Sequence, residues 1–249
     1  PDVLWNDVAW PPGGDLAALF AHYYNTVPDG VINDRWIQPS GRRNVITDSL
    51  TRAAGDLIQL LWKHIPEKDK QLTFPGAHWY DFRTPEYAVF DTVQDKKWEA
   101  TRGVGHSFGA NRNERPQDIV TATELVHMLV DVVSKNGNLL IGIGPDAQGR
   151  IVPEQQAPLR GLGEWMAAHG DVIRGSRPWT APATETTEGT PVRFVRKGDE
   201  VFAILLGLPG MRTFGLRGVD GIDEITLPER VPVEPAYVVP LGTGARWSG

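Results

Sequence analysis

The first 34 residues, PDVLWNDVAWPPGGDLAALFAHYYNTVPDGVIND (1–34), contain the pattern from which the fold class is predicted. They open with a short apolar run that ends at Asp7, before a loop rich in proline and glycine. After Asp15, a residue type that caps helices, leucines and aromatic residues recur at helical spacing until Pro28. A second apolar run, VIND (31–34), follows. This order of strand, helix and strand predicts an α/β fold with parallel strands.

The alternation of strands and helices continues to about Pro178. The segment WEATRGVG (98–105) and the apolar run NLLIGIGP (138–145) are both read as strands. Proline at the first helical position predicts one helix from Pro116 to Lys135, stopped by Gly137, and another from Pro153 to near Gly170. A further helix is expected over 48–64. These elements predict a parallel sheet covered by helices over 1–178.

The pattern changes behind residue 178. VRFVRK (192–197) and VFAILL (201–206) flank a GDE turn, which predicts a β-hairpin, and the rest of the chain is punctuated by proline and glycine without helical spacing. We therefore expect a domain boundary near residue 178, with an all-β domain over 179–249.

Composition excludes several classes of protein and site. The 249 residues are 41% hydrophobic and have a formal net charge of -6, with no Lys/Arg-rich run of five or more residues, so a nucleic-acid partner is not expected. The absence of cysteine excludes disulfides and thiol nucleophiles. No apolar stretch is long enough to span a bilayer, and the histidines lack metal-ligand spacing, so no membrane span and no metal site are predicted.

Polar side chains follow three of the expected strands. The first group is Asn6 and Asp7, the second is NDRW (33–36) and the third is NRNE (111–114). In barrels of parallel strands, catalytic side chains come from the carboxyl ends of the strands. Three such groups in succession therefore predict an active site at these strand ends.

Each polar group also has an interpretation that needs no catalysis. Asp7 stands before a proline-rich loop and fits an Asx turn equally well. Asp34 and Arg35 fit a buried ion pair, which we favour for Asp34. Arg112 and Glu114 fit an exposed ion pair within a loop, which would contribute little to the free energy of folding. For the nine tryptophans, core packing is a simpler explanation than stacking on sugars.

The candidate side chains are carboxylates, an arginine and aromatic residues, which together are typical of glycosidases. A retaining glycosidase needs an ionised carboxylate as nucleophile and a protonated carboxyl about 5–5.5 Å away as acid. A guanidinium favours the ionised nucleophile, and an apolar wall raises the pKa of an acid. Other chemistry has less support, because Ser107 lacks the nucleophile-elbow pattern and GIGPDAQGR (142–150) fits a turn better than a phosphate loop.

Six longer motifs occur in an order that is specific as a set. They are VLWNDVAWP (3–11), VINDRW (31–36), DFRTPEY (81–87), KKWEATRGVGHSFGANRNE (96–114), NLLIGIGPDAQGRIVP (138–153) and LRGLGEWMAAHGDVIRGSRPW (159–179).

Together these motifs resemble the C-terminal part of the α-L-fucosidases of glycoside hydrolase family 29. The resemblance covers residues 1 to about 180 and implies part of a (β/α)8 TIM barrel over 1–178. The segment 179–249 matches the family's C-terminal β-sandwich in position, so a small all-β sandwich domain is expected there. The implied activity is retaining hydrolysis of terminal α-L-fucosyl linkages by double displacement, which needs no cofactor. The implied partner is a fucosylated glycan.

The resemblance also assigns roles to individual residues. Asp7 falls on the nucleophile of the family's strand-end motif, and Trp5 in the same motif lines the fucose pocket. Arg35 matches the arginine beside the sugar and the nucleophile. Phe108 matches an aromatic residue near the methyl group of the sugar, although plain core packing also accounts for it.

The position of the acid/base varies within the family, and two residues compete for it here. Glu86 occupies the position used by members with a D-F-x-T-x-E-Y segment, where a loop can place it over the leaving group. Glu99, in the W-E motif, is the alternative, although its strand-like surroundings also suit a buried structural partner. We expect Glu86 to be the acid/base, with Glu99 as the competing candidate.

The chain departs from the family pattern in two respects. The stretch from Ile37 to His78 is much longer than the loop that joins the flanking motifs in many relatives, and it either caps the site or is inert. The family's early barrel strands, with the His and Trp residues that hold fucose hydroxyls, have no counterpart here. Because a barrel that lacks strands has open edges and half a pocket, we expect these 249 residues to be a fragment that is inactive alone.

Two rival functions stay open at this point. A carbohydrate-binding protein would hold glycans on its tryptophan-rich surfaces, although binding alone does not need Asp7, Arg35 and a candidate acid together. A retaining glycosidase for a related sugar such as galactose is the other alternative, and it would use the same carboxylates.

Overall fold

The structure is a computed structural model that describes residues 1–7, 10–11, 13–37, 79–222 and 224–248. The helix expected over 48–64 and the insertion from Ile37 to His78 lie outside the described residues, apart from Ile37 itself. The chain divides into two compact units. The first comprises Pro1–Ala88 with Lys96–Glu99, and the second comprises Val89–Asp95 with Ala100–Gly249.

The first unit begins with the predicted strand, helix and strand. Strand β1 (Val3–Leu4) pairs in parallel with β2 (Val31–Ile32), and α1 (Leu16–Thr26) connects them. The helix starts where the sequence predicts, because the side chain of Asp15 accepts a hydrogen bond from the amide of Ala18 at 2.9 Å. The parallel pairing brings the residues after β1 and β2 to the same edge of the sheet.

Close packing between α1 and the start of β2 requires glycine at position 30. The hydroxyl of Tyr23 donates a hydrogen bond to the carbonyl of Asp2 at 2.9 Å. A Cβ atom on Gly30 would lie 2.5 Å from that hydroxyl. The tyrosine therefore ties the end of α1 to the start of β1 only because residue 30 has no side chain.

In the first unit, two isolated β-bridges extend the parallel pairing beyond β1 and β2. Asn33 pairs in parallel with Phe82, and Arg83 pairs in parallel with Trp98 at the start of β3 (Trp98–Gly103). Among the described residues of this unit, each extended segment thus lies beside the one described before it. One hydrophobic cluster in the described part of this unit contains the buried residues Phe20, Tyr23, Ile32 and Trp36.

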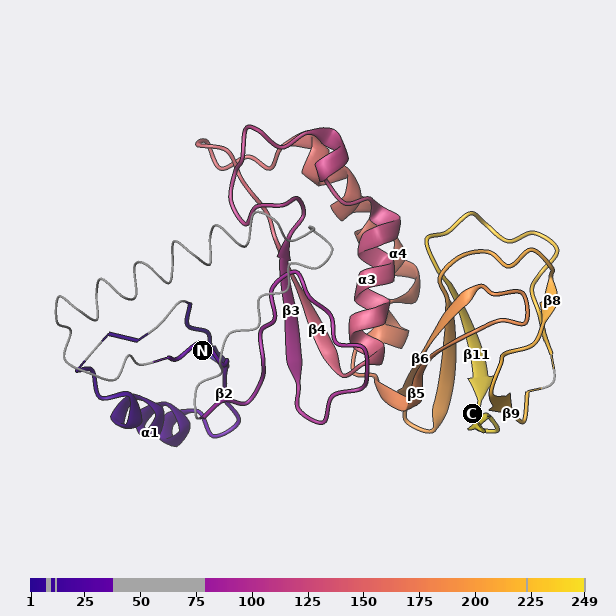
Figure 1. Cartoon of the computed structure of the whole chain (residues 1–249), viewed down its shortest axis with the longest axis horizontal. Helices are drawn as coiled ribbons and strands as arrows, with labels where there is room; N and C mark the ends of the chain where they lie inside the picture. The colour runs from indigo at the N-terminus through magenta and orange to yellow at the C-terminus, as the bar shows by residue number, and fades with distance from the viewer. Residues whose placement is uncertain (8–9, 12, 38–78, 223, 249) are drawn as a thin grey trace, which may run out of the picture. The chain divides into compact units, whose positions relative to one another are not determined.

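The second unit contains two helices and the C-terminal strands. Strand β3 neighbours β4 (Gly137–Gly142), and α3 (Ala122–Ser134) lies between them in sequence. Helix α4 (Pro153–Ile173) follows and lies beside α3 (Figure 1). Among the described residues, no helix is both long and apolar enough to cross a bilayer.

The prediction of one continuous helix from Pro116 to Lys135 is wrong. Pro116 opens only a 3₁₀ turn, η2 (Pro116–Asp118), and a separate helix, α3, begins after Thr121. The side chain of Thr121 accepts a hydrogen bond from the amide of Glu124 at 3.2 Å, and Glu124 accepts one from the amide of Thr121 at 2.7 Å. This reciprocal capping box stabilises a new helix start and interrupts the predicted helix.

The expected stop at Gly137 is also displaced by one residue. Asn136, not Gly137, takes the left-handed backbone conformation, with φ 74°, and Gly137 is already the first residue of β4. Asparagine tolerates this conformation better than other residues with side chains. Its side chain donates a hydrogen bond to the carbonyl of Gln94 at 2.8 Å, which fixes the turn.

The described C-terminal strands pair in antiparallel fashion. The predicted hairpin is confirmed, because β6 (Pro191–Lys197) pairs antiparallel with β7 (Glu200–Leu205). The four-stranded sheet has the order β11-β7-β6-β5 and is completed by β5 (Arg177–Glu185) and β11 (Tyr237–Gly242). Two further pairs join β8 (Thr213–Phe214) to β10 (Ile225–Thr226) and β9 (Val219–Asp220) to β12 (Arg246–Trp247).

Both faces of the four-stranded sheet are covered. Val192 and Phe194 of β6 belong to a core that also contains Phe214 and Leu216, whereas Val195 on the opposite face packs in the same cluster as Val130 and Trp165 of α3 and α4. This alternation follows from the two-residue period of a strand.

The predicted boundary at residue 178 falls inside the second unit and stays a prediction. The described sheets have two or four strands, so the partial TIM barrel and the separate β-sandwich also stay predictions.

Candidate functional site

Two asparagines join the ends of β1 and β2 through hydrogen bonds. The amide of Asn6 donates a hydrogen bond to the side-chain oxygen of Asn33 at 3.0 Å, and the side-chain nitrogen of Asn33 donates to the carbonyl of Asn6 at 2.7 Å. The side chain of Asn6 also donates to the carbonyl of Arg35 at 3.1 Å. These bonds extend the pairing of the strands and fix the backbone that carries Asp7 and Arg35.

Thr84 orients the guanidinium of Arg35, whose side chain is only 3% exposed. The Nε of Arg35 donates to the hydroxyl of Thr84 at 2.7 Å, and Nη2 donates to the carbonyl of Thr84 at 3.0 Å. The hydroxyl of Thr84 in turn donates to Asp34 Oδ1 at 2.7 Å, as does its amide at 3.1 Å. The buried Asp34 is thereby a structural residue that positions Thr84, which in turn positions Arg35.

Arg35 joins the two carboxylates that the sequence predicts as nucleophile and acid/base. Its Nη1 donates to Asp7 Oδ1 at 3.1 Å and forms a short hydrogen bond with Glu86 Oε1. Two hydrogen bonds to one nitrogen keep the two carboxylate oxygens within about 6 Å of each other. The side chain of Asp7 is 65% exposed and that of Glu86 is 16% exposed, so Asp7 is the one open to an incoming ligand.

Trp5 lies between Arg35 and the second candidate acid. The guanidinium carbon of Arg35 lies 4.8 Å from the centroid of the Trp5 ring, a cation–π contact. The indole Nε1 of Trp5 donates to Glu99 Oε1 at 2.9 Å. Burial raises the pKa of the Glu99 carboxyl, and the hydrogen bond from Trp5 and the charge of Arg35 oppose part of that rise.

The backbone directly after Glu86 is strained. Tyr87 has φ 49°, which is unusual for a residue with a bulky side chain. Such conformations cost about 1–3 kcal/mol and persist only where surrounding contacts hold them. Here the hydrogen bonds of Thr84 and the ion pair of Glu86 hold the segment, so Glu86 projects from a fixed turn.

The structure brings together five of the six residues predicted for the site. Trp5, Asp7, Arg35, Glu86 and Glu99 all belong to the first unit and are linked through Arg35 and Trp5. Phe108 belongs to the second unit, where it is 43% exposed, and its role stays a prediction.

Sequence reasoning missed the positioning role of Thr84. The only signal was its place inside the DFRTPEY motif, next to Pro85, which carries no information about Arg35.

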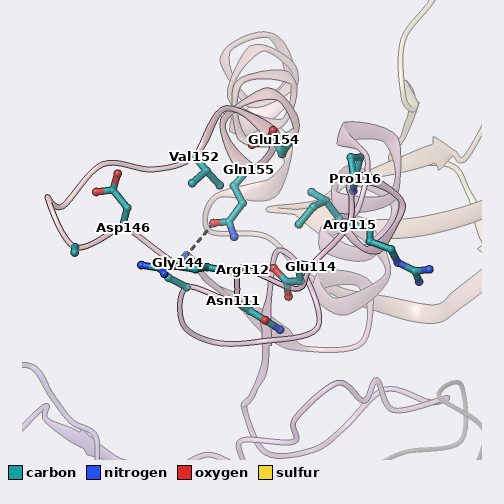
Figure 2. Close-up of a pocket in the computed structure, with 13 residues that line it drawn as sticks. Asn111, Arg112, Glu114, Arg115, Pro116, Gly144, Asp146, Val152, Glu154 and Gln155 are labelled. Atoms are coloured by element: carbon teal, nitrogen blue, oxygen red, sulfur yellow. Dashed lines mark hydrogen bonds between the residues drawn. The ribbon is translucent and has the colours of Figure 1, made fainter.

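The third polar group lies in the second unit, where Asn111, Arg112 and Glu114 line a pocket. This pocket of about 480 Å³ is formed by the loop after β3, the turn after β4 and the first turn of α4 (Figure 2). Gln155 reaches from α4 and accepts a hydrogen bond from the amide of Gly144 at 3.0 Å, as the dashed line in Figure 2 shows.

Several of the charged side chains around this pocket stabilise local turns. Glu114 accepts a hydrogen bond from the amide of Ser107 at 3.0 Å, and Arg115 pairs with Asp118 at 3.0 Å. Asp146 caps the turn predicted for GIGPDAQGR by accepting from the amide and the guanidinium of Arg150. Of the third polar group, Glu114 therefore has a local structural role.

Comparison with known proteins identifies the family. The family model described as "Alpha-L-fucosidase" matches residues 1–171. The tissue α-L-fucosidase of Homo sapiens is 35% identical over 216 residues, which are 84% of this chain and 39% of the human protein.

Solved structures from Thermotoga maritima are similar as well. Its α-fucosidase in complex with fucose matches 96% of this chain and 51% of that protein, with 34% identity and a TM-score of 0.72. Its α-L-fucosynthase in complex with α-L-Fuc-(1-2)-β-L-Fuc-N3 matches 96% of this chain and 50% of that protein, with 34% identity and a TM-score of 0.73. The chain thus spans about half or less of the length of these relatives. The family match covers more than half of its residues, and the chain belongs to the α-L-fucosidase family.

Proposed function

We propose that these residues act within a longer polypeptide, called here the full-length enzyme, that hydrolyses terminal α-L-fucosyl linkages with retention of configuration. Support comes first from family membership and from the relatives that are named fucosidases. The Thermotoga maritima relatives, which bind fucose or a fucose disaccharide in their complexes, support a fucosylated glycan as the substrate.

The single observation that carries the retaining mechanism is the pair of carboxylates on Arg35. Their oxygens lie within about 6 Å of each other, because both bond to the same guanidinium nitrogen. Retaining glycosidases hold their two carboxyl groups about 5–5.5 Å apart, whereas inverting enzymes need about 6.5–9.5 Å to admit a water. An upper limit of about 6 Å between the nearest oxygens is compatible with the retaining spacing, and together with the family membership it supports the retaining class.

In the proposed reaction, Asp7 attacks the anomeric carbon of fucose while the glycosidic bond breaks. The bonding electrons pass to the leaving oxygen, which takes a proton from Glu86. Glu86 then removes a proton from water, the water oxygen attacks the anomeric carbon, and the bond to Asp7 breaks. Arg35 keeps Asp7 in place and stabilises its negative charge.

We also propose that the 249 residues are inactive by themselves. Glycosidases bind the reacting sugar in a pocket that buries most of its surface and excludes water. In the first unit the proposed nucleophile Asp7 is 65% exposed. Because the human relative is matched over only 39% of its length, further residues are available in such proteins to complete the pocket.

The test is hydrolysis of an aryl α-L-fucoside by the full-length enzyme and by the isolated 249 residues. We expect turnover by the former and none above the background rate by the latter. Robust turnover by the isolated chain would refute the proposed requirement for further residues. An aryl α-galactoside in parallel distinguishes a galactosidase, and sugar binding without hydrolysis by the full-length enzyme would favour a carbohydrate-binding protein.

The choice between Glu86 and Glu99 as the acid leads to a separate prediction. Glu86→Ala should lower turnover of natural glycosides by about 10²- to 10⁴-fold, because their leaving oxygen needs a proton. It should spare the glycosylation step for aryl fucosides with good leaving groups, which depart without help. The measurement is kcat/KM for both substrate types. If Glu99→Ala shows this pattern and Glu86→Ala does not, the assignment of Glu86 is wrong.

A further inference from the structure

The Glu99 carboxyl, the Trp5 indole and the Arg35 guanidinium form a continuous line of contacts. Glu99 Oε1 accepts the indole hydrogen bond at 2.9 Å, and the guanidinium of Arg35 lies 4.8 Å from the centroid of the same ring. Arg35 then bonds to Asp7 and Glu86. Glu99 is therefore linked to Asp7 and Glu86 indirectly, through Trp5 and Arg35.

A tryptophan side chain that is only partly buried needs a further contact, such as a hydrogen bond, to hold its ring in one orientation. Trp5 follows the two-residue strand β1 directly, and it is only partly buried, so packing alone leaves its ring less constrained than that of a core residue. Its Nε1–H is the only polar group on the ring, and a hydrogen bond there fixes the plane of the indole. Glu99 supplies that bond from β3, a strand 94 positions further along the chain.

We propose that Glu99 is a positioning residue that fixes the Trp5 ring and, through it, the guanidinium of Arg35. This proposal deepens the proposed function: the fixed ring offers an apolar surface to the sugar, and Arg35 stays in place to hold Asp7 and Glu86. Glu99 acts as a hydrogen-bond acceptor and takes no part in proton transfer to the leaving group.

The surroundings of Glu99 are consistent with an acceptor role. The groups that act on its carboxyl are the indole N–H of Trp5 and the positive charge of Arg35, which itself is shared with Asp7 and Glu86. Glu99→Gln keeps a side-chain carbonyl at this position and removes the charge and the exchangeable carboxyl proton. Glu99→Ala removes the acceptor as well. The two variants therefore separate positioning from acid catalysis.

The first arm of the test observes the indole directly and does not depend on turnover. In the full-length enzyme with ¹⁵N-labelled tryptophan, the Trp5 Nε1–H resonance is assigned by its loss in Trp5→Phe. Glu99→Ala should move this resonance upfield, because the N–H loses its acceptor, and Glu99→Gln should leave it near its original position. The matched control is Glu234→Ala, since Glu234 pairs with His169 in the second unit, and it should not move the resonance.

The second arm measures KM and kcat with an aryl α-L-fucoside and with a natural fucoside. Glu99→Ala should raise KM about tenfold for both substrates, the effect of losing one hydrogen bond to a charged group, with a smaller change in kcat. Glu99→Gln should recover the affinity to within about threefold, since an amide oxygen still accepts the indole hydrogen bond.

Two results would overturn the proposal. An unmoved Trp5 resonance in Glu99→Ala would mean that Glu99 does not hold the indole. Equal loss of natural-glycoside turnover in Glu99→Gln and Glu99→Ala, with aryl fucosides spared, would make Glu99 the acid, because neither variant can donate the proton. If the full-length enzyme hydrolyses no fucoside at all, the proposed function fails, and the resonance still decides whether Glu99 positions Trp5.

Discussion

Replacing Asp7 by glycine in the full-length enzyme is expected to abolish release of fucose, with a loss in kcat of at least about 10⁴-fold. The reason is that the first half of a double displacement needs a carboxylate to form the glycosyl–enzyme bond, and no other group in the described site is placed to replace it. The fold should tolerate the change, because the Asp7 side chain is 65% exposed and its ion pair with Arg35 is one of several bonds that hold the guanidinium. The measurement is the initial rate with an aryl α-L-fucoside.

Azide makes the same experiment specific for a nucleophile. The space left by the carboxylate admits a small anion, which should attack the anomeric carbon and restore part of the turnover, giving fucosyl azide as the product. Asp29→Gly is the matched control, because Asp29 is exposed in the turn between α1 and β2, and its activity should stay within about twofold. Undiminished activity of Asp7→Gly would rule out Asp7 as the nucleophile.

Replacing Arg35 by methionine should have the second-largest effect, on both stability and activity. The change leaves the largely buried carboxylate of Glu86 and the carbonyl of Thr84 without their partner, which costs about 3–5 kcal/mol in the free energy of unfolding. The exposed Asp7 adds little to that loss. Turnover should fall by about 10²- to 10³-fold, because the positive charge that stabilises and positions the attacking carboxylate of Asp7 is gone.

A second arginine provides the control for this variant. Arg193 pairs with Asp131 in the second unit and is 21% exposed, so Arg193→Met should also lower stability. It should leave the kcat of the remaining folded enzyme within about twofold, since Arg193 contacts none of the proposed catalytic residues. Thermal unfolding and kcat measured on the same samples separate the two effects. Equal kcat in Arg35→Met and the unsubstituted enzyme would show that Arg35 has only a structural role.

Local patterns in the sequence were sufficient to predict where several helices and strands of the described chain begin. Asp15 predicted the start of α1, and the proline at 153 predicted the start of α4, because both signals act on the backbone within one helical turn. The error at Pro116 also has a local cause. The Thr121 to Glu124 capping box was present in the sequence, and it starts α3 more effectively than the proline five residues earlier.

Part of the candidate site could also be predicted from local sequence patterns. Asp7 and Arg35 follow directly after apolar runs that pair as parallel strands, so their positions at one sheet edge follow from the strand assignment. Thr84 could not be recognised, because its role depends on the direction of two side chains, those of Asp34 and Arg35, that lie about 50 positions away in sequence.

The polar residues at the strand ends, the two carboxylates that compete for the role of acid, and the family to which the motifs point could all be recognised from the amino-acid sequence. The difference between those two carboxylates became visible only in the folded protein. Glu86 shares the guanidinium of Arg35 with Asp7, whereas Glu99 bonds to the indole of Trp5, and its burial raises its pKa. These contacts join residues 51 and 94 positions apart, and burial and hydrogen-bond geometry at such separations arise only when the segments pack together.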